Sequence, residues 1–85
     1  MIVVRTKYFS KVVIKLPVQA KRALAERLQL FMNDPFSPLL NNHALQGDRQ
    51  PCRSINITGD YRLVYEQYDE ETVLLIDIDT HSFLY

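Results

Sequence analysis

The chain has 85 residues, which predicts a single domain over residues 1–85 with a core that buries roughly 60–65% of the unfolded surface. Hydrophobic residues make up 47% of the sequence and charged residues 24%, a composition typical of globular domains that argues against intrinsic disorder. The single cysteine excludes an internal disulfide, and without a membrane-length apolar run or a signal peptide we expect a soluble cytoplasmic protein.

The formal net charge is zero, yet the two signs are segregated along the chain. Residues 1–62 hold all ten basic residues and four acidic ones, whereas residues 63–85 hold six acidic residues and no basic one. Such asymmetry can create a basic surface for nucleic acid or for an acidic protein partner. The alternative is that the acidic residues solvate a hairpin and the basic residues solvate helices.

The first elements in chain order are a short strand and a helix. Residues 2–4 are β-prone, and apolar residues recur at helical spacing between Tyr8 and Leu16. Three β-branched residues in this stretch make it a mediocre helix former. Pro17 then disfavours helical geometry in the residue before it and suits the first turn of a new helix.

The second helix is the clearest element, because apolar residues recur at spacings of four, four and three from Ala20 to Phe31. It should end before Pro35. Two helices joined at a proline suggest an antiparallel pair that covers one face of a sheet. Residues 34–51 contain three prolines and predict a long loop without regular structure, and such loops tend to be functional.

Three strands are expected in the remainder, at residues 53–57, 61–66 and 73–78. Thr58-Gly59-Asp60 is a hairpin signal, and the nearly continuous apolar run of the third strand favours a central strand buried on both faces. The predicted fold class is therefore α+β. A strand and two helices are followed by a three-strand antiparallel meander, with the helices packed on one twisted sheet.

The order of elements and several local motifs resemble the RelE/ParE superfamily of bacterial toxin–antitoxin toxins, with details closest to its YafQ-like branch. The most specific motifs are His43-Ala44-Leu45-Gln46-Gly47 and the terminal Thr80-His81-Ser82. Further matches are Leu16-Pro17, Asp34-Pro35, Asn41-Asn42 and the segment 53–62. The resemblance spans nearly the whole chain and implies a RelE-like fold.

The resemblance also implies a function. Members of this branch are ribosome-associated, metal-independent endoribonucleases that cleave mRNA and are neutralised by a co-encoded antitoxin. The expected partners are therefore a cognate antitoxin and mRNA on the ribosome, with no membrane and no small-molecule cofactor. Two alternatives remain open: a ParE-like toxin that poisons DNA gyrase by binding, and a catalytically weakened member that acts as an antitoxin-binding module.

Carried over by position, the resemblance implies that His43 is the loop histidine of the family motif and His81 its terminal histidine. Asp60 and Tyr61 match an Asp-aromatic pair, and Tyr85 matches a terminal aromatic residue. RNA is cut without metal when its 2′-hydroxyl attacks the adjacent phosphate, which needs a base, an acid and a cation. Histidine titrates near neutral pH, so His43 and His81 are the natural proton-transfer pair.

Each of the other candidates has a structural alternative. Asp60 could orient a histidine or bond its own turn backbone. Tyr61 could stack on a base or pack in the core, and Tyr85 could relay a proton or be a frayed surface residue. Two departures from the family pattern also stand out. Asn56 occupies the position of a further histidine, and Asp77 lies near that of an arginine.

Three arginines are candidates for binding the RNA phosphates, because a guanidinium fork matches phosphate oxygens. They are Arg49, Arg53 and Arg62, and the alternative is that they solvate strand edges. Cys52 has no base motif around it and is expected to be inert. No metal site is predicted, since no spacing of His, Cys or Asp resembles a zinc or calcium motif.

Overall fold

The computed structural model describes residues 1–80, so the predicted site residues His81 and Tyr85 lie outside the described residues. The chain begins with strand β1 (Ile2–Arg5) and helices α1 (Lys7–Ile14) and α2 (Val18–Asn33). Short 3₁₀ turns η1 (Pro38–Leu40) and η2 (Gly47–Arg49) flank strand β2 (His43–Ala44). Strands β3 (Arg53–Asn56), β4 (Tyr61–Gln67) and β5 (Thr72–Thr80) complete the fold.

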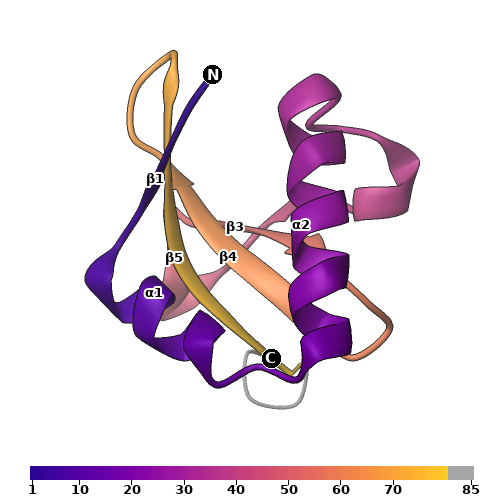
Figure 1. Cartoon of the computed structure of the whole chain (residues 1–85). Helices are drawn as coiled ribbons and strands as arrows, with labels where there is room; N and C mark the ends of the chain where they lie inside the picture. The colour runs from indigo at the N-terminus through magenta and orange to yellow at the C-terminus, as the bar shows by residue number, and fades with distance from the viewer. Residues whose placement is uncertain (81–85) are drawn as a thin grey trace.

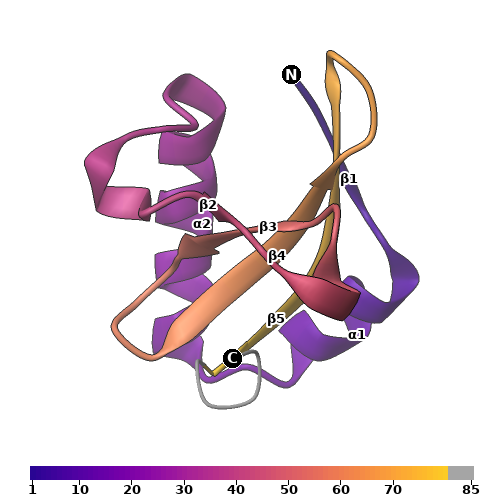
Figure 2. The same cartoon turned by 180° about the vertical axis from the view of Figure 1, so that it is seen from behind.

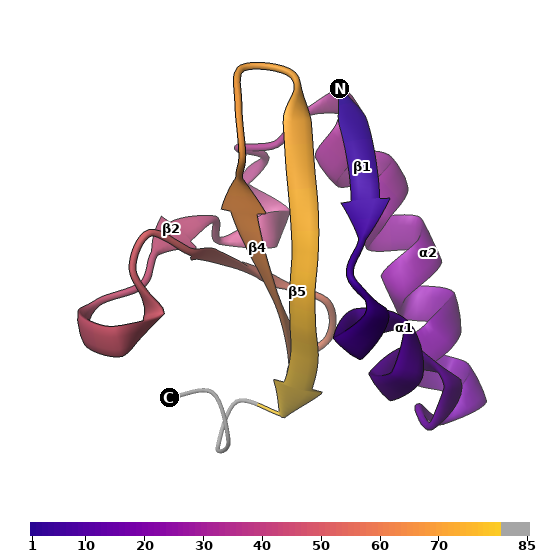
Figure 3. The ribbon, with the colours of Figure 1, turned by 90° about the vertical axis from the view of Figure 1, so that its left-hand side faces the viewer.

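The strands form one five-stranded mixed sheet in the order β1-β5-β4-β3-β2. The predicted antiparallel meander of β3, β4 and β5 is confirmed, and β1 adds to β5 in parallel. β5 is therefore an interior strand, as its apolar run predicted, but the prediction that it is buried on both faces is wrong, since only its helix-facing side chains are buried. Figures 1 and 3 show both helices on one side of this sheet, which confirms the α+β architecture. The two helices do not run side by side. α1 lies against β5, whereas α2 extends away from β5 along its length (Figure 1).

The prediction of an irregular loop over residues 34–51 is wrong in part. This segment contains η1, β2 and η2, and β2 pairs antiparallel with β3. A strand of two residues leaves no periodic pattern in the sequence, which explains why it was not predicted. Figure 2 shows the segment from β2 through η2 crossing the side of the sheet that faces away from the helices.

The helices begin for identifiable local reasons. The Thr6 side chain caps α1 by accepting a hydrogen bond from the Phe9 amide at 3.1 Å, and it also donates to the Leu75 carbonyl at 2.9 Å. α2 starts after Pro17, whose missing N–H costs nothing at a helix N-terminus. The Thr6 contact with β5 fixes the point where the chain leaves the sheet.

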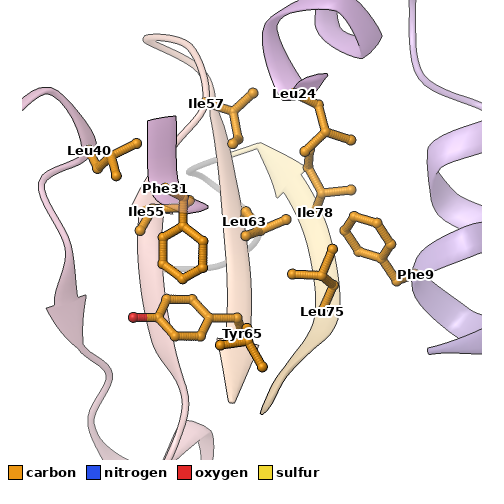
Figure 4. Close-up of a cluster of buried hydrophobic side chains, with 11 residues drawn as sticks. Phe9, Leu24, Phe31, Leu40, Ile55, Ile57, Leu63, Tyr65, Leu75 and Ile78 are labelled. Atoms are coloured by element: carbon orange, nitrogen blue, oxygen red, sulfur yellow. The ribbon is translucent and has the colours of Figure 1, made fainter. Parts of the chain in front are cut away.

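The main core lies between the helices and the sheet, and Figure 4 shows its side chains converging from both layers. Alternation along the strands directs one set of side chains to this helix-facing side and the other set to the opposite side, called the open face below. The core residues are Phe9, Leu24, Phe31, Leu40, Ile55, Ile57, Leu63, Tyr65, Val73, Leu75 and Ile78. The open face has a much smaller cluster, built from Leu45, Val64, Cys52 and Ile76.

Candidate active site

A bulge in β5 decides which acidic residues reach the open face. Val64 pairs with Asp77 and Tyr65 with Leu75, so Ile76 is an extra residue in the ladder. Strict alternation from Leu75 would place Asp77 in the core, whereas the bulge returns Ile78 to the core and leaves the carboxylate outside. The open face of β5 therefore presents Asp77 and, two residues later, Asp79.

His43 lies on the same face as this carboxylate. Its Cα partner on β3 is Ser54, which pairs with Val64 and through it with Asp77, so the four residues form one row across the sheet. Side chains directly opposite one another in antiparallel strands share a face. Three strand spacings separate the ends of this row, so the backbones of His43 and Asp77 are about 14 Å apart.

The His43 ring is oriented by the residue two places before it. Its Nδ1 atom lies 2.8 Å from the carbonyl oxygen of Asn41, which can only accept a hydrogen bond. Nδ1 must therefore carry the hydrogen, and in the neutral ring the lone pair is on Nε2. Asn41 itself has φ of 46°, in the left-handed region that asparagine tolerates.

Arg62 lies in the next row of the open face, between Asn56 and Asp79. Its Nη1 donates to the carbonyls of Thr58 and Tyr61 at 3.0 and 3.2 Å and to that of Gly59 at 3.2 Å. This arginine therefore braces the β3–β4 turn. Within residues 1–80, the buried Oδ1 of Asn56 has no hydrogen-bond partner.

The turn that contains Asp60 is organised by a threonine. The Thr58 hydroxyl oxygen accepts from the backbone amides of Asp60 and Tyr61, at 3.1 and 3.0 Å. Asp60 is exposed, and its side chain is not needed to build this turn. Its position next to Tyr61, which pairs with Thr80, places it near the point where the described chain ends.

Tyr61 lies on the helix side of the sheet, where it packs against the main core. Together with residues of α1 it lines a hollow of about 370 Å³. Arg53 also belongs to the helix side, because its partner on β4 is the core residue Tyr65. Its Nε donates to Asn42 Oδ1 at 2.9 Å, and its guanidinium lies over the Phe36 ring at 5.4 Å. The structure thus separates Tyr61 and Arg53 from the face of His43.

Arg49 at the end of η2 influences the open face electrostatically. Burial raises the pKa of Asp77, and the Asp79 carboxylate raises it further, while the Ile78 amide and Arg49 act in the opposite direction. Burial and Glu66 likewise raise the pKa of the Cys52 thiol, and Arg49 lowers it. A raised pKa disfavours the thiolate, which agrees with the expectation of an inert cysteine.

Residues 1–80 contain no group of three or more His, Cys, Asp or Glu side chains arranged to hold a metal ion. Within the same residues, no helix has the length and apolar character needed to cross a membrane.

Comparison with known proteins identifies close structural relatives. A family model described as the ParE toxin of the type II toxin–antitoxin system parDE matches residues 5–85. No curated protein sequence matches the chain significantly. YafQ from Escherichia coli BL21(DE3) is 20% identical, with a TM-score of 0.78 over 98% of this chain and 96% of that one. YafQ is also known in the DinJ–YafQ toxin–antitoxin complex.

Two further structures are similar. A YoeB/ParE toxin from Agrobacterium tumefaciens is 20% identical, with a TM-score of 0.77 over 95% of this chain and 99% of that one. A copper-bound mutant toxin from Helicobacter pylori is 24% identical, with a TM-score of 0.69 over 100% of this chain and 99% of that one. These likenesses show that the chain shares the fold of these toxins.

Proposed function

Because the chain belongs to the ParE toxin family of type II toxin–antitoxin systems, we propose that it arrests growth by cleaving mRNA on the ribosome. The family match confirms the resemblance to the RelE/ParE superfamily, and the YafQ structures are consistent with the YafQ-like branch. Endoribonuclease activity is the finer proposal. The observation that supports it best is His43, held on the open face in the tautomer whose Nε2 can accept a proton.

In the proposed reaction, His43 Nε2 removes the proton from the RNA 2′-hydroxyl. The 2′-oxygen then attacks the adjacent phosphorus, and the bond from phosphorus to the 5′-oxygen breaks. His81 donates a proton to that leaving oxygen, so that a 2′,3′-cyclic phosphate and a free 5′-hydroxyl result. Asp60 is proposed to orient the terminal histidine, and Tyr85 to take part in proton transfer.

Arg49 and Arg62 are the proposed phosphate contacts, since both are associated with the open face. A guanidinium near the phosphate stabilises the extra negative charge of the transition state. Arg53 and Tyr61 were also candidates for binding RNA. The position of Tyr61 on the helix side favours its structural alternative, core packing. Arg53, also on the helix side, hydrogen-bonds Asn42, a role that differs from the predicted solvation of a strand edge.

A cognate antitoxin is the proposed protein partner. Membership of a toxin–antitoxin family supports it, and YafQ forms such a complex with DinJ. Residues 1–25 carry six basic side chains and no acidic one, so this N-terminal part of the chain would attract an acidic segment of the antitoxin.

The test is to sequence RNA ends after induction of the wild type, His43→Ala and His81→Ala, with exposed Gln29→Ala on α2 as the control. Loss of an acid or base should lower cleavage by about 10²- to 10⁴-fold in each histidine variant and leave the control unchanged. Full cleavage by both histidine variants would exclude the mechanism.

A second candidate is a ParE-like toxin that poisons DNA gyrase by binding. The ParE family match favours it, as do the two carboxylates that Asp77 and Asp79 present on the open face, where RNA phosphates would be repelled. Blocked replication with intact mRNA after induction would select this candidate.

A further inference from the structure

We infer that Asn42 is a positioning residue, which holds the His43 imidazole in place on the open face by anchoring the segment before β2. The inference rests on the proposed role of His43 in proton transfer. The Asn42 side chain lies on the opposite side of the sheet from the His43 ring. In the sequence, Asn42 directly precedes the loop histidine His43.

β2 alone provides a weak attachment for His43. The strand has only two residues, His43 and Ala44, and it lies at the edge of the sheet. The preceding residues 34–42 contain only the single 3₁₀ turn η1. A segment with so few ladder hydrogen bonds needs another attachment if its side chain is to be held within a fraction of an ångström.

The Asn42 side chain supplies that attachment with three hydrogen bonds. Its Nδ2 donates to the Pro35 carbonyl at 2.9 Å and to the Tyr65 hydroxyl oxygen at 2.8 Å, which uses both amide hydrogens. Its Oδ1 accepts from Arg53 Nε at 2.9 Å. One amide therefore joins the start of the loop, strand β3 and strand β4.

The groups that hold Asn42 are themselves fixed by packing. Tyr65 is only 2% exposed, and its ring meets the edge of Phe31 from α2 at 4.8 Å between centroids. Figure 4 shows these two rings in contact, with the Tyr65 hydroxyl at the border of the apolar cluster. Arg53 is held over the Phe36 ring. Asn42 is thus hydrogen-bonded to the buried Tyr65 and to Arg53, and a fully satisfied polar group beside a packed core is a rigid anchor.

This anchor acts on His43 through the backbone. Asn41 and His43 are the two neighbours of Asn42, and strand alternation points Asn42 to the helix side and His43 to the open face. Fixing the Asn42 amide therefore also fixes the Asn41 carbonyl, which selects the His43 tautomer at 2.8 Å. A small displacement of a catalytic group is enough to lower a rate strongly.

The test compares Asn42→Ala with Asn42→Asp and with a matched control, Asn33→Ala at the exposed end of α2. Ring ¹⁵N chemical shifts of His43 report the tautomer directly. We expect hydrogen on Nδ1 in the wild type and the control, and a mixture of both tautomers in Asn42→Ala. Cleavage by Asn42→Ala should fall about 10- to 100-fold through kcat, with KM little changed.

Asn42→Asp should recover part of the wild-type signal, because a carboxylate still accepts from Arg53 and the Tyr65 hydroxyl can reverse to donate to it, whereas the Pro35 carbonyl loses its donor. A wild-type tautomer and wild-type ring mobility in a folded Asn42→Ala would overturn the inference. If the wild type does not cleave RNA at all, the proposed function fails, but the ¹⁵N measurement still decides whether Asn42 positions His43.

Discussion

The two faces of the sheet have different compositions. The helix-facing side buries eleven core residues, whereas only Leu45 and Val64 are buried in the cluster of the open face. The open face instead carries His43, Arg62 and the two aspartates of β5. Hydrophobic burial is thus concentrated on the helix side, and the histidine and carboxylate groups named above are on the open face. Substitutions on the helix side should therefore mainly lower stability, and substitutions on the open face should mainly change activity.

The strongest test of this separation is a pair of neighbouring residues on β4. Leu63→Ala removes a fully buried side chain from the main core and should lower the unfolding free energy by about 2–5 kcal/mol. Val64→Ala, on the open face, should cost less, because its cluster is small and fewer carbon atoms are removed. Urea titration of both variants measures the difference.

The cleavage activities of Leu63→Ala and Val64→Ala should differ only because the two variants contain different fractions of folded protein. When the fraction of folded protein is taken into account, Leu63→Ala should retain wild-type cleavage. An equal or larger stability loss in Val64→Ala would show that the open face contributes as much to folding as the helix side does.

The sequence predicted the helix side well. Helical and strand periodicity located both helices and the three meander strands, because these elements bury one regular stripe each. It did not predict β2, which is too short to show a period, or the bulge at Ile76. A bulge depends on pairing with another strand, and local composition does not encode it.

The candidate site was predicted only as a set of residues. The motif identified His43, and the hairpin signal Thr58-Gly59-Asp60 located the turn before β4. The side-chain contacts of Asn42 join it to residues 23 and 11 positions away, Tyr65 and Arg53. Such contacts exist only after the chain folds, so no local pattern could reveal them.

A smaller effect is expected from Arg62, which belongs to the open face but also braces a turn. Arg62→Ala should weaken binding of a non-cleavable, 2′-deoxy-substituted RNA by about 10-fold, because one charge-assisted phosphate contact is lost. Stability should fall modestly, since Nη1 no longer donates to the Thr58, Gly59 and Tyr61 carbonyls.

Arg62→Lys provides the matched comparison, because it keeps the positive charge and loses the guanidinium fork. If binding depends on charge alone, the lysine variant should bind as the wild type does. Unchanged RNA affinity in Arg62→Ala, measured by fluorescence anisotropy, would restrict this residue to its structural role.

The smallest expected effect concerns Asp77, whose pKa is raised mainly by burial. In the unfolded chain this carboxyl ionises at its ordinary pKa, so from about pH 4 upward the unfolded state loses its proton first. The unfolding free energy therefore falls as pH rises through this window, and the loss is complete above the folded-state pKa. The unfolding free energy of Asp77→Asn does not fall in this way, because asparagine does not ionise. The variant should therefore be more stable than the wild type at pH 7.

The gain should be about 1 kcal/mol or less, because Asp77 is only partly buried and solvent screens its charge. It should disappear near pH 3, where the carboxyl is protonated in both states. Urea titrations of wild type and variant at both pH values measure this difference. The same variant should bind RNA more tightly at pH 7, since one repulsive charge leaves the open face. Equal stability at both pH values, together with unchanged RNA affinity, would mean that the bulge places this carboxylate where it affects neither folding nor RNA.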